Sequence, residues 1–245
     1  MNPGKEKNTF TNLESNFFLQ KLFDNMKRNR QLEILKYNKK LQKKLNLTLN
    51  DYKEYSQIYT PIEIEMKLSK LKYHYEFISN LPSESCHIYF DDSKEEVKRN
   101  YLVENDKVEK IRIIIDYPVF FQDCLFAKAD FISSITFKKF YRNNITNLSL
   151  MFFGCSSLKE INFLSFNTEN VTSMRSMFYL CTSLEKLDLS KFNTKNVTNM
   201  AAMFNGCSSL KELNLSNFDT NNVTDMSGMF FGCSSLIKIK NKKSI

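Results

Sequence analysis

The sequence predicts an α/β solenoid, in which short parallel strands and short helices alternate and stack behind a cap that is partly helical and partly β. The first observation that leads to this prediction is a cysteine that recurs every 26 residues, at Cys155, Cys181, Cys207 and Cys233. The second is an L-x-x-L-x-L pattern that follows each cysteine, and units of this period bury their apolar faces by stacking. The third is a hydrophobic content of 42%, which is enough to build a core.

The leucine pattern predicts the strand of each coil, a coil being one 26-residue repeat unit. Apolar and polar residues alternate there, as expected for a short strand that buries one face. A 26-residue period with this pattern lies within the range of leucine-rich repeats. The columns of equivalent apolar residues are Leu158, Leu184, Leu210 and Leu236, then Ile161, Leu187, Leu213 and Ile239, and then Phe163, Leu189 and Leu215.

The segment before each cysteine predicts a short helix. In VTDMSGMF, Thr224 or Asp225 can cap the first turn of such a helix. The apolar residues that follow are spaced at i, i+3, i+4 and i+7, which places them on one helical face. These residues are Met226, Met229, Phe230 and Cys233. Because one coil cannot bury both its strand and its helix alone, we expect the coils to stack.

The repeat extends upstream with less regular residues. Residues 125–150 fit the same columns, with Ala129 in the place of the cysteine. One step earlier, Val108, Ile111 and Ile113 fit the leucine columns at a spacing of 24. The sequence therefore predicts about five coils over residues 108–245, of which the first is atypical, as terminal repeats usually are.

The four repeat cysteines are interpreted as a structural ladder in the core. Cysteine is among the residue types most often buried, where it behaves as a small hydrophobic side chain. A zinc site needs ligands that converge as a tetrahedron, whereas one cysteine per coil gives a line with neighbours about 4.8 Å apart. A disulfide between neighbouring coils is disfavoured because the Cβ vectors run parallel. We therefore expect reduced thiols and no metal at Cys155, Cys181, Cys207 and Cys233.

The N-V-T triplets that begin at Asn170, Asn196 and Asn222 recur in the same repeat. Each is formally a glycosylation sequon. We interpret them instead as turn residues, whose side chains satisfy backbone groups between the strand and the next segment.

The exposed face of the strands is the candidate partner-binding surface. The pairs Lys159-Glu160, Glu185-Lys186 and Lys211-Glu212 place opposite charges on neighbouring strands, which helps to fix their register. The face is thus largely self-neutralised, and nothing on it names a ligand. The predicted binding face is a polar column beside these pairs, formed by Thr136, Asn162, Asp188, Asn214 and Lys240.

The segment CSSLKELNLSNFDTNNVTDMSGMF resembles the repeat of the BspA-like leucine-rich-repeat surface-protein family. The resemblance covers residues 125–245, where Cys, Ser-Ser-Leu, N-F-D/N-T, N-V-T and M-F recur in order. Members of that family are usually bacterial or protist proteins, often surface-exposed, and implicated in adhesion and protein binding. The resemblance therefore implies a leucine-rich-repeat fold with a protein-binding role.

Residues 1–60 predict a helical N-terminal region. Two amphipathic helices over residues 12–46, joined by a basic turn, are expected to form a hairpin. This pair weakly resembles an F-box, a short helical module that often precedes leucine-rich repeats. Residues 61–107 predict a mixed capping segment with short strands at IEIEM and CHIYF, which would cover the first coil.

The sequence holds no recognisable catalytic constellation. Its two histidines, His74 and His87, both lie outside the repeats. Cys86 precedes His87 directly, and neighbours in a strand face opposite sides, so they do not form a nucleophile–base pair. No glycine-rich phosphate loop, H-E-x-x-H or C-x-x-C motif occurs. We therefore predict no enzyme activity, no cofactor and no bound metal.

The sequence thus predicts a non-enzymatic scaffold for protein–protein interaction, with a protein partner of unknown identity. The alternatives are an F-box-like ubiquitin-ligase substrate adaptor and a secreted surface adhesin. The net charge of +8 does not by itself predict nucleic-acid binding. We expect a monomer without a membrane span, because no apolar run approaches about 18 residues. The lack of an apolar leader predicts a cytoplasmic location, with the cell surface or secretion as the alternative.

Overall fold

The structure is a computed structural model that describes residues 39–44, 60–79, 85–116, 124–142 and 145–241. The chain divides into two compact units, residues 1–58 and 59–245. In the first unit the structure describes one helix, α3 (Lys39–Lys44). The remainder of the two helices predicted over residues 12–46 lies outside the described residues.

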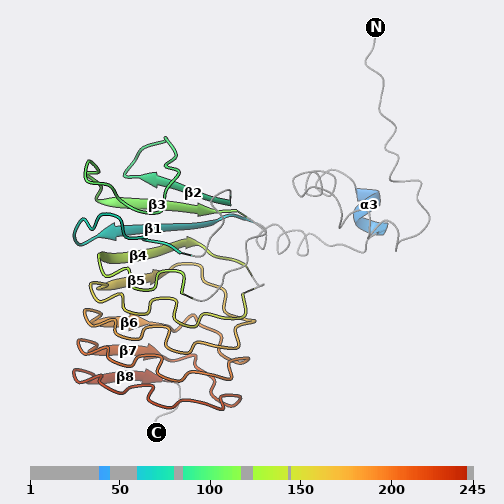
Figure 1. Ribbon diagram of the computed structural model, residues 1–245. Coiled ribbons are helices and arrows are strands. Elements are labelled where there is room, and N and C mark those ends of the chain that lie inside the picture. Colours follow the sequence, from blue (N-terminus) through green and yellow to red (C-terminus); the bar gives the residue numbers. More distant parts are fainter. Residues whose placement is uncertain (1–38, 45–59, 80–84, 117–123, 143–144, 242–245) are drawn as a thin grey trace. The chain divides into compact units, whose positions relative to one another are not determined.

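The second unit contains two sheets, which Figure 1 shows one above the other. The first sheet has five strands in the order β2-β3-β1-β4-β5, and the second has three in the order β6-β7-β8. The strands are β1 (Ile62–Leu68), β2 (Cys86–Phe90), β3 (Lys110–Ile115), β4 (Ile132–Lys139), β5 (Glu160–Phe163), β6 (Lys186–Asp188), β7 (Glu212–Leu215) and β8 (Lys238–Asn241).

The three N-terminal strands are antiparallel to their neighbours. β1 has the sequence IEIEMKL, and its alternation buries every second side chain. It lies between β3 and β4 and pairs antiparallel with both. The strands predicted at IEIEM and CHIYF are thereby confirmed as β1 and β2.

The repeat strands pair in parallel, each residue beside its equivalent 26 positions away. Ile135 of β4 lies beside Ile161 of β5. Leu213 of β7 lies between Leu187 of β6 and Ile239 of β8. The inward side chains of one column therefore pack on one another, and the outward side chains form matching columns on the surface.

The predicted helices do not form, and the prediction of an α/β solenoid is wrong. In the described part of residues 59–245 the chain has no α-helix, and the segments before the cysteines are successive tight turns. Each segment contains two residues with φ between 53° and 75°, four positions apart, whereas an α-helix needs φ near about −63°. These left-handed pairs are Leu150 and Gly154, Ser176 and Leu180, Ala202 and Gly206, and Gly228 and Gly232.

The turns also use their backbone differently from a helix. Alternate N–H groups donate to carbonyls of the next coil rather than four residues back in the same coil. The bonds of one coil are Leu150 N to Arg175 O at 3.0 Å, Phe152 N to Met177 O at 2.9 Å and Gly154 N to Tyr179 O at 2.8 Å. Equivalent bonds link Ser176, Phe178 and Leu180 to the coil after that. Hydrogen bonds thus join the coils on the turn side as well as on the strand side.

Two further features depart from the predicted solenoid. The strands form two sheets rather than one continuous sheet, with the break between β5 and β6. Residues 108–113 are not a first coil stacked in parallel, because β3 pairs antiparallel with β1 and β1 separates it from β4. The periodic apolar residues of β3 match the leucine columns because any strand with one buried face alternates in this way.

Phenylalanine rings form a continuous stack through the core. Neighbouring rings are 5.4–5.7 Å apart between centroids, and their planes lie within 9° of parallel. The stack consists of Phe126, Phe152, Phe178, Phe204 and Phe230, one from each of five successive coils. The nearly constant spacing means that each coil repeats the position of the one before it.

The N-V-T triplets serve the backbone, which confirms their interpretation as turn residues. The Asn196 side-chain amide donates to the Glu169 carbonyl at 2.8 Å. The hydroxyl of Thr198 donates to the carbonyl of Thr172, its equivalent one coil earlier, at 3.2 Å. Asn222 and Thr224 repeat both contacts in the next coil. These side chains therefore link neighbouring coils.

The left-handed positions lead to a first prediction. Gly206 has a φ of 75°, and an added Cβ would lie 2.6 Å from Cδ2 of Leu180. We expect Gly206→Ala to lower the free energy of unfolding by about 1–2 kcal/mol, because the left-handed conformation is strained for any residue with a Cβ. The matched control is Ala202→Gly, which relieves such strain at a φ of 53° and should be neutral or stabilising by up to about 1 kcal/mol. Urea denaturation of both variants measures the difference, and equal losses would contradict the assigned backbone conformation.

Candidate functional site

The predicted binding face is divided by the break between the two sheets. Thr136 and Asn162 are neighbours in β4 and β5. Asp188, Asn214 and Lys240 are neighbours in β6, β7 and β8. The structure therefore brings the column together as two groups, and the larger group lies on the three-stranded sheet.

A groove of about 260 Å³ lies on the outward side of the three-stranded sheet. Its polar lining comes from alternate positions of the strands, because successive side chains of a strand point to opposite faces. The lining residues are Lys186, Leu187, Asp188, Glu212, Leu213, Asn214, Lys238 and Lys240. We call this surface the β6–β8 face.

Opposite charges pair across the strands of the β6–β8 face and beside it. Lys186 Nζ lies 3.2 Å from Glu212 Oε1, and Lys211 Nζ lies 2.8 Å from Glu185 Oε2. The bond from Lys211 is the main cause that lowers the pKa of the Glu185 carboxyl below its usual value. Pairs as exposed as these contribute little to stability, but they favour the observed register.

Two cations of β8 are left over from this pairing. Lys238 and Lys240 form no ion pair with any residue that the structure describes, and both are exposed. The nearest acidic side chain in register, Glu212, is engaged by Lys186. The charged side chains of β6 and β7 on the β6–β8 face, Lys186, Asp188 and Glu212, are mainly acidic, whereas those of β8 are both lysines.

The structure places three of the repeat cysteines in the core. Cys155, Cys181 and Cys207 are fully buried, whereas Cys233 of the last coil is half-buried. Each thiol donates to the carbonyl of a phenylalanine of the preceding coil, at 3.0–3.2 Å. Burial raises the pKa of Cys155 and Cys207 to about 12, so these thiols stay protonated at neutral pH. Among the described residues no group of three or more His, Cys, Asp and Glu side chains could hold a metal ion.

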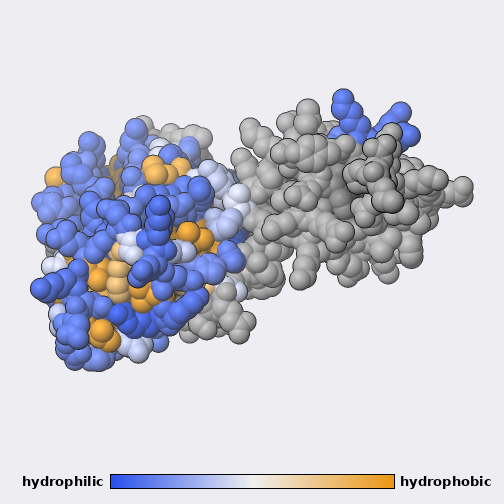
Figure 2. All heavy atoms as spheres, turned by 90° about the horizontal axis from the view of Figure 1, so that it is seen from above, coloured by the Kyte–Doolittle hydropathy of each residue, from blue (hydrophilic) through white to orange (hydrophobic). Residues whose placement is uncertain are grey.

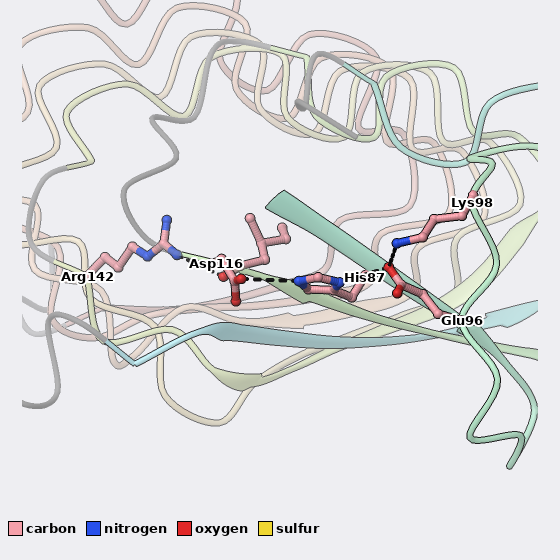
Figure 3. Close-up of polar contacts among 6 residues, drawn as sticks. His87, Glu96, Lys98, Asp116 and Arg142 are labelled. Carbon is pink, nitrogen blue, oxygen red and sulfur yellow. Dashed lines mark hydrogen bonds and ion pairs between the residues drawn. The ribbon is translucent and has the colours of Figure 1, made fainter. Parts of the chain in front are cut away.

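A polar cluster surrounds His87 at the other end of this unit (Figure 3). His87 lies on β2, and its Nδ1 is 2.8 Å from Oε1 of Glu96 while its Nε2 is 3.1 Å from Oδ2 of Asp116. Lys98 approaches the same oxygen of Glu96 at 2.6 Å. Hydrogen bonds to Glu96 and then to Asp116 raise the pKa of His87. The imidazolium is thus held between two carboxylates, one on each ring nitrogen.

Arg142 completes this end of the sheet. Its guanidinium is fully buried, and Nη2 donates to the carbonyl of Ile115 at 2.8 Å, next to Asp116. In the repeat register Arg142 occupies the column of Thr168 and Thr194. Thr194 is buried and exchanges two hydrogen bonds with the backbone of the next coil, so this column joins neighbouring segments. Arg142 joins the end of β3 to the segment after β4 in the same way.

Sequence reasoning assigned no role to Glu96, Asp116 or Arg142. The one available signal was an arginine in a column of threonines. The residues around His87 offer little chemistry beyond an ion-pair network. Cys86 is buried on the opposite side of β2, and burial raises the pKa of its thiol to about 11. It therefore does not form a thiolate–imidazolium pair with His87.

The cluster predicts a pH-dependent contribution to stability. Because the folded pKa of His87 lies above the usual value of 6.5, its contribution is complete below pH 6.5 and is lost as pH rises through the folded pKa. The pKa of Glu96 is lowered from 4.5 by Lys98 and His87, so its contribution is lost as pH falls below that value.

We expect the urea midpoint of His87→Gln to approach that of the wild type as pH rises from 6 to 8. The variant should be the less stable of the two at pH 6, because glutamine cannot carry the charge between Glu96 and Asp116. His74→Gln is the matched control, since that ring is exposed and pairs with one carboxylate among the described residues, Glu104. A constant difference between the wild type and His87→Gln across this range would contradict the assignment.

The comparisons with known proteins match the repeats better than they match the whole chain. Residues 121–242 match the family model described as "Mycoplasma protein of unknown function, DUF285". The repeats are similar to this family. The match covers just under half of the chain. No curated protein matches the chain.

Among solved structures, the chain is similar to a leucine rich cell surface protein from Faecalibacterium prausnitzii A2-165. The two are 22% identical with a TM-score of 0.29, over 54% of this chain and 35% of that one. The chain thus spans about a third of the length of that protein. These comparisons do not support the predicted cytoplasmic location, and the BspA-like resemblance stays a prediction. No helix among the described residues is long and apolar enough to cross a bilayer.

Proposed function

We propose that the repeat region is a non-enzymatic scaffold for protein–protein interaction and that the partner binds across the β6–β8 face. The observation that carries this proposal is that the two sides of the strands differ: one side packs in the core and the other faces outward. Leu187, Leu213 and Leu215 are buried in the core, whereas the side chains between them point outward. The contacts of these outward side chains lie at the surface, such as the bond from Ser190 N–H to Asp188 Oδ1 at 2.8 Å and the bond from Ser216 N–H to Asn214 Oδ1 at 3.2 Å. The outward side chains are therefore exposed or partly exposed to a partner, while the core of the fold is formed by the inward ones.

The backbone supports such a role because it presents these positions rigidly. Parallel pairing joins β6, β7 and β8 on the strand side. Backbone bonds such as Met200 N to Asp225 O at 2.8 Å join the same coils on the turn side. A surface that is already ordered loses little conformational entropy when a partner binds, which favours affinity.

The adaptor alternative depends on the N-terminal helices, which lie outside the described residues except for α3. It therefore receives no support from the geometry. Unlike it, the scaffold proposal depends on residues whose positions the structure gives.

Site-specific photocrosslinking in the full chain tests the proposal. A photoreactive amino acid at position 214 lies on the β6–β8 face, and one at position 195 lies on an exposed turn of the same region. In lysate of the source cells we expect a discrete crosslinked protein from position 214 that is absent from position 195. Excess unlabelled chain should compete it away. Equal labelling at both positions, or none at position 214, would count against a partner on this face.

A further inference from the structure

The outer edge of β8 is open in the part of the chain that the structure describes. β8 pairs with β7 on one side only, so the N–H and C=O groups of its other edge point away from the sheet. An edge of this kind is a template for an additional strand from another chain.

The apolar core is also open at this edge. Met226, Phe230 and Ile239 are 47%, 37% and 45% exposed. Their equivalents one coil earlier, Met200, Phe204 and Leu213, are at most 1% exposed. The last coil therefore presents the same apolar columns as the others, but among the described residues nothing packs on the side of it that faces away from the preceding coil.

The chain itself closes the opposite edge of the repeats with β1. Ile62, Ile64 and Met66 of this strand are fully buried and continue the apolar columns beyond β4. Between them, Glu63 and Glu65 form ion pairs with Lys139 and Lys138 of β4, at 3.1 and 2.7 Å. A strand with alternating acidic and apolar residues is thus what this fold uses to cover a basic strand. Seen from the β2 side, the described surface is largely hydrophilic with smaller hydrophobic areas (Figure 2).

The open edge of β8 would be covered by a strand of the same kind, in which acidic and apolar residues alternate. Its sequence, KIKN, places Ile239 on the core side between two outward lysines. Along the column that contains Lys238, the charges of the three-stranded sheet alternate in sign through Lys186, Glu212 and Lys238. A strand added beside β8 would continue this series with a carboxylate next to Lys238, and it would need an apolar residue to cover Ile239.

We propose that the open edge of β8 binds an extended segment of a protein partner in which acidic and apolar residues alternate. The segment adds a strand to the sheet, its carboxylates pair with Lys238 and Lys240, and its apolar residue packs on Ile239. This inference deepens the proposed scaffold function and rests on it. A second copy of the chain paired through β8 is disfavoured, because an antiparallel pair of two such strands places lysine opposite lysine.

A peptide with the sequence of residues 60–67, TPIEIEMK, is a suitable probe because β1 already performs this role on β4. The matched control peptide, TPIKIKMK, replaces the two glutamates by lysines and leaves the other residues unchanged. We expect the labelled acidic peptide to bind the full chain saturably, as measured by fluorescence anisotropy, and more weakly at high salt. The control peptide should bind at least about tenfold more weakly, since two attractive pairs become repulsive.

Charge reversal on the protein gives the decisive comparison. Lys238→Glu with Lys240→Glu should lose at least about tenfold in affinity for the acidic peptide and gain affinity for TPIKIKMK. Lys191→Glu with Lys195→Glu makes the same change in net charge at exposed positions away from β8 and should leave both affinities within about twofold. The gain for the control peptide cannot come from an unfolded variant.

Each other outcome overturns the inference. No binding of the acidic peptide, equal loss in both double variants, or chain dimerisation that blocks the peptide would each remove β8 as a site for an acidic strand. Crosslinking from position 214 is measured on the β6–β8 face and needs no peptide. A partner found there while β8 fails to bind would leave the scaffold function intact.

Discussion

Replacement of Phe178 by alanine should lower the free energy of unfolding by about 3–5 kcal/mol. The ring is fully buried and stacks between Phe152 and Phe204, at 5.4 and 5.6 Å between centroids. Backbone hydrogen bonds on the turn side, from Phe152 N to Met177 O and from Phe178 N to Met203 O at 2.9 Å each, fix the distance between these coils, so the coils cannot close over the lost ring. The variant therefore retains most of the cavity, which adds to the lost transfer free energy.

Urea denaturation of the full chain measures this cost. Phe231→Ala is the matched control, because that ring is 74% exposed and its loss should change stability by less than about 0.5 kcal/mol. Phe178→Leu should fall between the two, since leucine fills part of the space. A cost for Phe178→Ala no larger than that for Phe231→Ala would mean that the ring stack is not the core of the repeats.

The period of the sequence predicted which side chains are buried, because that depends only on alternation and spacing. Equivalent residues such as Leu187 and Leu213 lie beside each other in the structure as their spacing requires. Period alone did not predict the backbone between the strands. Apolar residues at i, i+3, i+4 and i+7 fit one face of a helix, and they fit a series of tight turns equally well.

The signal against a helix was present but incomplete. Glycine at four of the left-handed positions, such as Gly154 and Gly206, marks a backbone that a helix does not allow. Leu180 occupies the equivalent position in one coil, and in the other left-handed column the equivalents of Gly228 are Leu150, Ser176 and Ala202. Leucine, serine and alanine favour a helix or are neutral in one, so they hid the left-handed positions from sequence reasoning. The hydrogen bonds between coils compensate for the strain, and they join residues that are 25 positions apart.

The His87 cluster escaped prediction for a related reason. Its members come from β2, the loop after it and the end of β3, which follow no common period. The antiparallel pairing of β2 and β3 brings them together, and a sequence without the pairing gives no reason to join them. The cationic edge of β8 could be anticipated from its lysines, whereas its exposure follows from the order of the strands.

The cost of truncating an inward residue should fall from the middle of the repeats toward β8. Leu187→Ala and Leu213→Ala should each lower the free energy of unfolding by about 2–5 kcal/mol, because both side chains are almost completely buried between neighbouring coils. Ile239→Ala alters the next residue of the same column and should cost less than about 1 kcal/mol, since that side chain is 45% exposed.

The same urea measurement on the three variants gives the gradient, and repeating it with saturating TPIEIEMK peptide tests its cause. A bound strand would bury Ile239, so the peptide should stabilise the wild type more than Ile239→Ala. It should stabilise Leu187→Ala as much as the wild type, because Leu187 lies two strands away from the open edge. Equal costs at all three positions without peptide would show that Ile239 is already covered, and the edge of β8 would then be closed to a partner.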